Sequence, residues 1–109
     1  MRLIRTVILC AVPLMGISAA AAQDSDMLAL GEALVAENCG ACHAIGTDDA
    51  SPLEGVRALR DLSQDYPVAF LAESLAEGIL TGHPAMPVLE FDAGEVDAVI
   101  AWLESIQVQ

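Results

Sequence analysis

A five-residue motif in the first half of the chain restricts what this sequence can become. Cys39-Gly40-Ala41-Cys42-His43 places two thiols a helical turn apart and an imidazole directly after the second thiol. Thiols at this spacing can serve as a redox dithiol, as half of a zinc site, as a disulfide, or as two covalent attachments to one cofactor. These uses need different surroundings, so the rest of the sequence decides between them.

The surrounding sequence favours covalent haem attachment. A thioredoxin-like dithiol needs a βαβ context, and no stretch alternates with a period of two for long enough to predict a strand. A zinc site needs about four ligands, and His83 is the only obvious extra donor. A disulfide would leave His43 unexplained. The motif therefore predicts one haem c, attached through Cys39 and Cys42, with His43 as a ligand of the iron.

The first 22 residues have the organisation of a secretory signal peptide. Two arginines form a cationic start, residues 7–17 are apolar, and a run of alanines closes the segment. We expect cleavage after Ala22, which leaves one periplasmic domain, residues 23–109, in the compartment where c-type haem is attached. The alternative is a retained anchor, although the apolar run is short beside the about 20 residues that a membrane span needs.

The expected mature domain is strongly acidic. Without the leader, Arg57 and Arg60 stand as the only cations against sixteen acidic residues, a difference of −14, and the sequence contains no lysine. Such a surface repels nucleic acid and anionic lipid, which argues against both as partners. The acidity does not indicate disorder, because 55% of the chain is apolar. A domain this small usually needs a disulfide, a metal or a cofactor to supplement its hydrophobic core.

Helical periodicity predicts an all-α fold of three to four short helices. A first helix begins near Asp26, with a cap from residues 24–26, and ends near Asn38. A short helical turn follows within residues 56–62. The last helix has the clearest start, because Asp92 and Glu95 have the spacing of a capping box.

Another helix is expected to begin with Pro67 at its first position. Four apolar residues recur at helical spacing after this proline and are expected to face inward: Val68, Leu71, Leu75 and Ile79. Gly82 and Pro84 are expected to end this helix.

The order of these parts resembles a class I c-type cytochrome over nearly all of residues 23–109. The likeness rests on a helix that leads into C-x-x-C-H, a proline after a short loop, a late Met-Pro pair, and a final helix with an aromatic residue. It implies the class I fold, with three to four helices wrapped around one haem. It also implies a soluble one-electron carrier.

The resemblance implies further site residues. Met86, in the pair Met86-Pro87, matches the distal ligand of the family, so the implied metal ligands are His43 and Met86. His83, three residues upstream, is the rival sixth ligand. Pro52 resembles the proline whose carbonyl accepts a hydrogen bond from the second imidazole N–H of the iron-bound histidine.

Other positions match the family's packing and its polar contacts. Gly31 and Trp102 match a crossing of the first and last helices, where a glycine lets an aromatic residue approach. Tyr66 is a candidate donor to a haem propionate. Arg57 and Arg60 are the only cations that can offset propionate charge, and the sequence does not choose between them.

Three functions remain open from the sequence. The first is a diffusible periplasmic electron carrier, a monomer rather than an enzyme, whose redox partner has a cationic docking surface. The second is a haem sensor with an open sixth position. The third is a dedicated cytochrome subunit or docking module of a membrane or periplasmic oxidoreductase complex.

Overall fold

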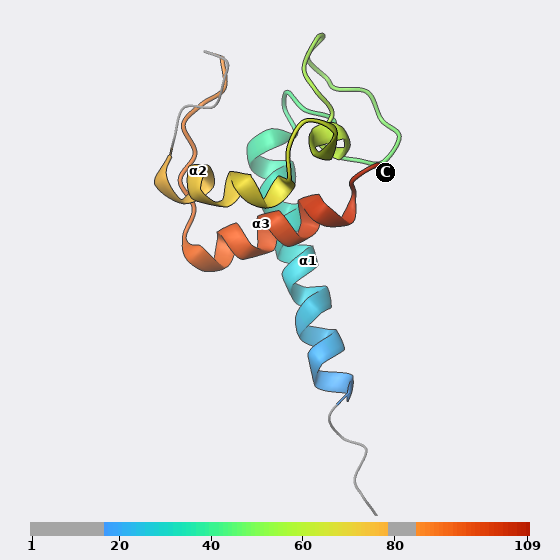
Figure 1. Cartoon of the computed structure of the whole chain (residues 1–109), viewed down its shortest axis with the longest axis vertical. Helices are drawn as coiled ribbons and strands as arrows, with labels where there is room; N and C mark the ends of the chain where they lie inside the picture. Colours follow the sequence, from blue (N-terminus) through green and yellow to red (C-terminus); the bar gives the residue numbers. More distant parts are fainter. Residues whose placement is uncertain (1–16, 79–84) are drawn as a thin grey trace, which may run out of the picture.

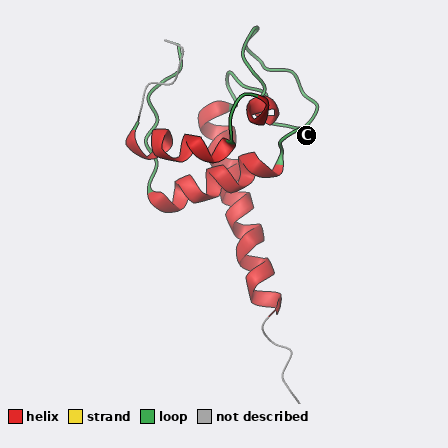
Figure 2. Cartoon of the chain, in the orientation of Figure 1, coloured by secondary structure: helices red, strands yellow, loops and turns green. Residues whose placement is uncertain are grey.

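The computed structural model describes residues 17–78 and 85–109, and this part of the chain is all-α (Figures 1 and 2). It contains three α-helices and two short 3-10 helices. In chain order they are α1 (Ile17–Cys39), η1 (Leu59–Gln64), η2 (Val68–Phe70), α2 (Leu71–Glu77) and α3 (Ala93–Ser105). The predicted fold class is confirmed, and no strand occurs within the described ranges.

Helix α1 is longer than we predicted. It ends at Cys39, one residue from the predicted end, but it begins at Ile17 rather than near Asp26. The alanines before Gln23 are strong helix formers, so the helix continues through them. The predicted cap is therefore wrong: residues 24–26 lie within the helix, and Ser25 Oγ donates to the carbonyl of Ala22 at 2.8 Å.

The first part of α1 is exposed and projects away from the rest of the molecule in Figure 1. The expected cleavage point after Ala22 lies within this part of the helix. The division into a leader and a domain of residues 23–109 stays a prediction. Among the described residues, no helix is long and apolar enough to cross a membrane.

The first and last helices cross at a glycine, as predicted. A Cβ on Gly31 would lie 2.0 Å from the carbonyl oxygen of Ala98 and 2.8 Å from the Cβ of Trp102, so only glycine allows this approach. Helix α3 begins with the predicted capping box, in which Asp92 and Glu95 exchange backbone and side-chain hydrogen bonds. The crossing therefore joins the part of α1 that precedes the C-x-x-C-H motif to a well-defined helix.

The buried core gathers around this crossing. Val35 of α1 has only 1% of its surface exposed. The rest of the core comes from η1, η2 and α3: Leu59, Leu62, Val68, Val99, Trp102 and Leu103. The core thus joins the two terminal helices to the segment between the motif and α2.

The segment between α1 and α2 departs from two predictions. The helical turn expected within residues 56–62 begins at Leu59 instead, because the Leu59 N–H donates to the carbonyl of Ala44 at 3.0 Å and cannot serve an earlier helical turn. Pro67 directly precedes η2 rather than opening an α-helix. The predicted inward positions are confirmed for Val68, which is buried, and for Leu71 and Leu75, which pack on the core.

Helix α2 ends earlier than predicted. It stops at Glu77, where Gly78 has the left-handed conformation (φ 71°) and its N–H donates to the carbonyl of Ser74. A glycine adopts this conformation without the steric cost that other residues pay. The predicted end signals Gly82 and Pro84, and the predicted inward residue Ile79, lie outside the described residues.

Candidate haem site

The C-x-x-C-H motif continues the last turn of α1. The carbonyl of Cys39 accepts hydrogen bonds from the N–H of Cys42 at 3.2 Å and from the N–H of His43 at 2.9 Å. These bonds hold the two cysteines and the histidine in a compact turn at the end of a helix. Both cysteines are free thiols and half-buried, which leaves their sulfur atoms for attachment to another group.

The ring of His43 is held by a backbone carbonyl. Its Nδ1 lies 2.7 Å from the carbonyl oxygen of Arg57. Because a carbonyl only accepts, Nδ1 carries the hydrogen in this bond, which in a neutral imidazole makes Nε2 the nitrogen that can bind a metal. The family resemblance implies Pro52 as the acceptor of this bond, whereas in the structure the acceptor is the Arg57 carbonyl. A role of Pro52 in binding the cofactor stays a prediction.

The loop after the motif is tied back to its surroundings. The buried Ala44 receives a hydrogen bond on its carbonyl from Leu59, and its N–H donates to Ser51 Oγ at 2.9 Å. The N–H of Leu53 donates to the carbonyl of Cys42. These bonds bring the Arg57 carbonyl back to the motif.

Met86 comes from the segment that returns from α2 to α3. The N–H of Phe91 donates to the carbonyl of Leu75 at 2.9 Å, which fixes this segment against α2. A Cβ on Gly78 would lie 3.1 Å from a methyl carbon of Val88, so the returning chain also packs on the end of the helix. The rival ligand His83 lies outside the described residues, so the structure does not compare it with Met86.

A cavity of about 500 Å³ lies where these segments meet, and we call it the main cavity. It is lined by both cysteines, by His43 and by Met86, so the structure brings all four of these predicted residues to one space. Its apolar walls come from η1, the start of α2 and the neighbouring loops: Leu53, Val56, Leu59, Leu62, Leu71, Pro87 and Leu89. Pro52 is not among the lining residues.

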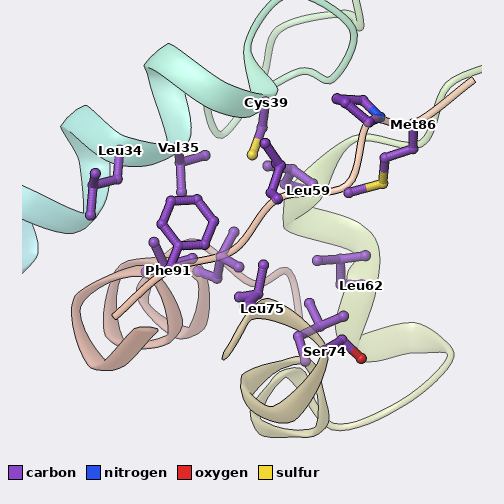
Figure 3. A pocket seen from close by; sticks show the side chains of 14 residues that line it. Leu34, Val35, Cys39, Leu59, Leu62, Ser74, Leu75, Met86 and Phe91 are labelled. Carbon is purple, nitrogen blue, oxygen red and sulfur yellow. The ribbon is translucent and has the colours of Figure 1, made fainter. Parts of the chain in front are cut away.

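A smaller cavity of about 60 Å³ continues the main cavity toward the core. Cys39 and Met86 line both cavities, and Figure 3 shows them on the walls with Leu59 between them in this view. Val35 and Phe91 also line the smaller cavity, and their side chains lie next to each other in Figure 3. The walls of this smaller cavity are apolar apart from Ser74, so they suit an apolar group.

The residues around the main cavity fit a haem. A porphyrin is a flat apolar ring with two carboxylates at one edge, and the cavity offers apolar walls with polar groups that include Arg57, Asp65 and Tyr66. The volume falls within the about 300–1,000 Å³ of typical small-molecule sites. Two thiols at this spacing can attach a haem covalently, and an oriented imidazole and a thioether are ligands that haem iron accepts.

The electrostatics of the walls suit an apolar ring. Burial raises the pKa of the Cys39 thiol to about 11, so this group is neutral at physiological pH. Burial also raises the pKa of Tyr66; the Arg57 charge lowers it and the Asp65 charge raises it. Both charges are therefore within electrostatic reach of the Tyr66 hydroxyl.

Some lining residues were not predicted as site residues from the sequence. Asp65 pairs with Arg57, and nothing in the sequence around it distinguishes it from the other acids. Leu59 and Leu62 had a detectable signal, since both lie in the segment predicted to be helical, but the observed helix is displaced from it.

Comparison with known protein families agrees with the c-type cytochrome that the C-x-x-C-H motif indicates. A family model described as cytochrome c oxidase, cbb3-type, subunit III matches residues 26–103, which is well over half of the chain. Searches among curated proteins and among solved structures gave no match. The matched range includes the C-x-x-C-H motif, Met86 and the α1–α3 crossing. On this evidence the chain is a c-type cytochrome and belongs to the family of cbb3-type cytochrome c oxidase subunit III.

Proposed function

We propose that this protein is a periplasmic one-electron carrier with a single haem c bound through Cys39 and Cys42 and ligated by His43 and Met86. The observation that carries the proposal is the main cavity, which is lined by these four side chains together. The family match supports electron transfer by haem c as the general activity. The attachment, the ligand pair and the carrier role are the proposed parts.

When bound, the haem supplies the one-electron chemistry, and the residues of this chain attach it, orient it and shield it. Cys39 and Cys42 would attach the haem at the end of α1. The Arg57 carbonyl orients the imidazole of His43. Met86 offers a neutral thioether, which favours the ferrous state and raises the reduction potential. The leucines of η1 and α2 exclude water.

An iron bound by both His43 and Met86 has no open position for a substrate. Electron transfer would then need only the approach of a redox partner and a matched reduction potential. An open sixth position would instead give a sensor or an enzyme. Carbon monoxide distinguishes these cases, because it binds the reduced form rapidly only where the sixth position is open.

A second candidate function is a dedicated cytochrome subunit or docking module of an oxidoreductase complex. The observation in its favour is the matched family, whose description names an oxidase subunit. The two candidates differ in whether the protein purifies alone or with a complex. Gentle solubilisation of native membranes, followed by size separation and haem staining, shows whether the haem band runs at the size of the free domain.

The proposed location and partner rest on the sequence. The leader of residues 1–22 directs the chain to the periplasm, and the acidic mature domain attracts a partner whose docking surface is rich in Lys or Arg.

The deciding test of the proposed function is the spectrum of the protein from the periplasm. The ferric form should have the weak near-infrared band of a sulfur-to-iron bond, and the reduced form should not take up carbon monoxide rapidly. Rapid uptake by the wild-type protein together with absence of the band would contradict the His43 and Met86 ligand pair.

A further inference from the structure

The wall of the main cavity is apolar except at a few positions, and two of these positions hold a pair of opposite charges. The guanidinium of Arg57 pairs with the carboxylate of Asp65, and both residues line the cavity. Their side chains are 41% and 51% exposed, so the pair lies at the rim of the cavity rather than deep within it. Tyr66 lines the cavity next to Asp65. The rim therefore has a cation, an anion and a hydroxyl group together.

The two arginines of the expected mature domain are placed differently. Arg60 is only 18% exposed, and it donates to the carbonyl of Gly46 at 3.3 Å and to Asp49 Oδ1 at 3.2 Å. These bonds stabilise the loop after the motif, and Arg60 is not among the residues that line the main cavity. Of these two arginines, Arg57 is therefore the one whose side chain can bind a carboxylate of a ligand in the main cavity.

We propose that Arg57 is the propionate-binding residue of this cytochrome, with its guanidinium between Asp65 and one haem propionate. This assignment rests on the proposed function. A guanidinium has five N–H donors in a fixed planar fork, so it can serve two carboxylates at once. Asp65 acts as a positioning residue, because its pairing with Arg57 holds the fork at the rim.

The same residue contacts the iron ligand through a different atom. The Arg57 carbonyl accepts from Nδ1 of His43, whereas its guanidinium pairs with Asp65. Substitution of the side chain leaves a backbone carbonyl at this position. A change in haem properties after such a substitution therefore reports the guanidinium rather than the loss of the His43 bond.

The sign of the effect follows from charge. Ferric haem carries one more positive charge than ferrous haem, so a nearby cation disfavours the ferric state and raises the reduction potential. Arg57→Gln should lower the potential, since it removes the cation and leaves Asp65 uncompensated. Arg57→Lys should keep most of the potential but lose the planar fork. Asp65→Asn should raise the potential, because the guanidinium then faces the propionate alone.

The test compares haem-loaded wild type with Arg57→Gln and Arg57→Lys, and uses Arg60→Gln as a control that removes the same charge outside the cavity. Two quantities are measured: the reduction potential, and the propionate bending band in the resonance Raman spectrum, which responds to hydrogen bonding of the propionate. We expect Arg57→Gln to lower the potential several-fold more than the control does and to shift the band. Arg57→Lys should shift the band with a smaller change in potential.

An unchanged propionate band in Arg57→Gln would overturn the assignment and leave Arg57 as a partner of Asp65 alone. If Arg57→Gln does not mature, Asp65→Asn carries the same test: it should raise the potential and shift the band, and an unshifted band overturns the proposal. Wild type without covalent haem would instead contradict the proposed function itself, and this is established before any variant is compared.

Discussion

Gly31 and Ala98 are in direct backbone contact where the first and last helices cross. A Cβ on Gly31 would lie 2.0 Å from the carbonyl oxygen of Ala98 and 2.7 Å from its carbonyl carbon. Backbone atoms cannot rotate away as a flexible side chain can, so the helices must separate to admit even one methyl group. This contact sets the position of α1, and therefore of the C-x-x-C-H motif at its end.

Gly31→Ala should destabilise the haem-loaded protein by about 3 kcal/mol or more, at the upper end of the cost of overpacking a core. Denaturant unfolding of the purified protein measures this. The control is Gly94→Ala in α3, where a Cβ would lie 3.4 Å from Asp92 Oδ1. The control should change the free energy of unfolding by about 1 kcal/mol or less, toward greater stability. Equal effects of the two substitutions would contradict a close crossing.

Local signals predicted the end of α1 and the capping box at Asp92 correctly, because each depends on residues whose chemistry is specific to the role. The crossing at Gly31 was implied by the resemblance to class I cytochromes, and the structure confirms it. The predicted end of α2 was wrong because the apolar spacing in the sequence continues past Gly78, whereas the helix ends at Glu77 with Gly78 as its left-handed cap. A periodic pattern does not report where a backbone turns.

The sequence indicated candidate side chains of the site but not its backbone contacts. The motif proposed both cysteines and His43, the family resemblance added Met86, and the structure places these four candidates around one cavity. The partner of His43 Nδ1 is a carbonyl, which every residue has, so the sequence around Arg57 contains no signal for it. The Arg57–Asp65 pair was missed for a related reason, because it depends on how the 3-10 helix η1 returns to the motif.

Met86→Ala should open the iron to external ligands. Loss of the thioether leaves a vacant position, so the reduced variant should bind carbon monoxide, lose the near-infrared band and have a lower potential, within the about 0.8 V that axial ligands control. His83→Ala is the matched control and should change none of these. If His83→Ala alone opened the iron, the two assignments would have to be exchanged.

The stability of the protein should decrease at alkaline pH because of Tyr66. Burial raises the pKa of Tyr66 above its ordinary value of 10.0. Above pH 10 the unfolded chain releases this proton before the folded chain does, so the folded state binds more protons there. The contribution of Tyr66 is fully present below pH 10 and is lost as the pH rises through the folded-state pKa.

Denaturant unfolding of wild type and Tyr66→Phe at a series of pH values from about 8 to 11 tests this linkage. The two curves of stability against pH should run parallel below pH 10, and wild type should lose more above it. Because Tyr66 is the only tyrosine of the chain, its ionisation can be followed directly in the same samples. Parallel curves over the whole range would contradict the raised pKa.

Electron transfer to the native partner should slow as salt is added. The expected mature domain has sixteen acids against two arginines, and attraction to a cationic partner can raise the association rate by about 10- to 10³-fold at low salt. Salt screens this attraction, over about 30 Å at 0.01 M but only about 10 Å at 0.1 M. Stopped-flow measurement of the second-order rate across this range gives the slope. A rate that rises with salt would show repulsion and contradict a cationic docking site.

Removal of either thiol should prevent normal maturation. Cys39→Ala and Cys42→Ala each delete one of the two attachment points, so most of the chain should accumulate without haem and be poorly folded, because the cofactor supplies much of so small a core. Haem staining of denaturing gels and circular dichroism measure the two effects. A stable, helical, haem-free protein would show that the main cavity does not depend on the cofactor.

The intact mass of the wild-type protein under denaturing conditions tests the central claim most directly. Protein isolated from the periplasm should have the mass of residues 23–109 plus one haem, and acid with organic solvent should not remove the added mass. A chain that has the mass of the polypeptide alone, or whose haem extracts into the solvent, would contradict covalent attachment through Cys39 and Cys42.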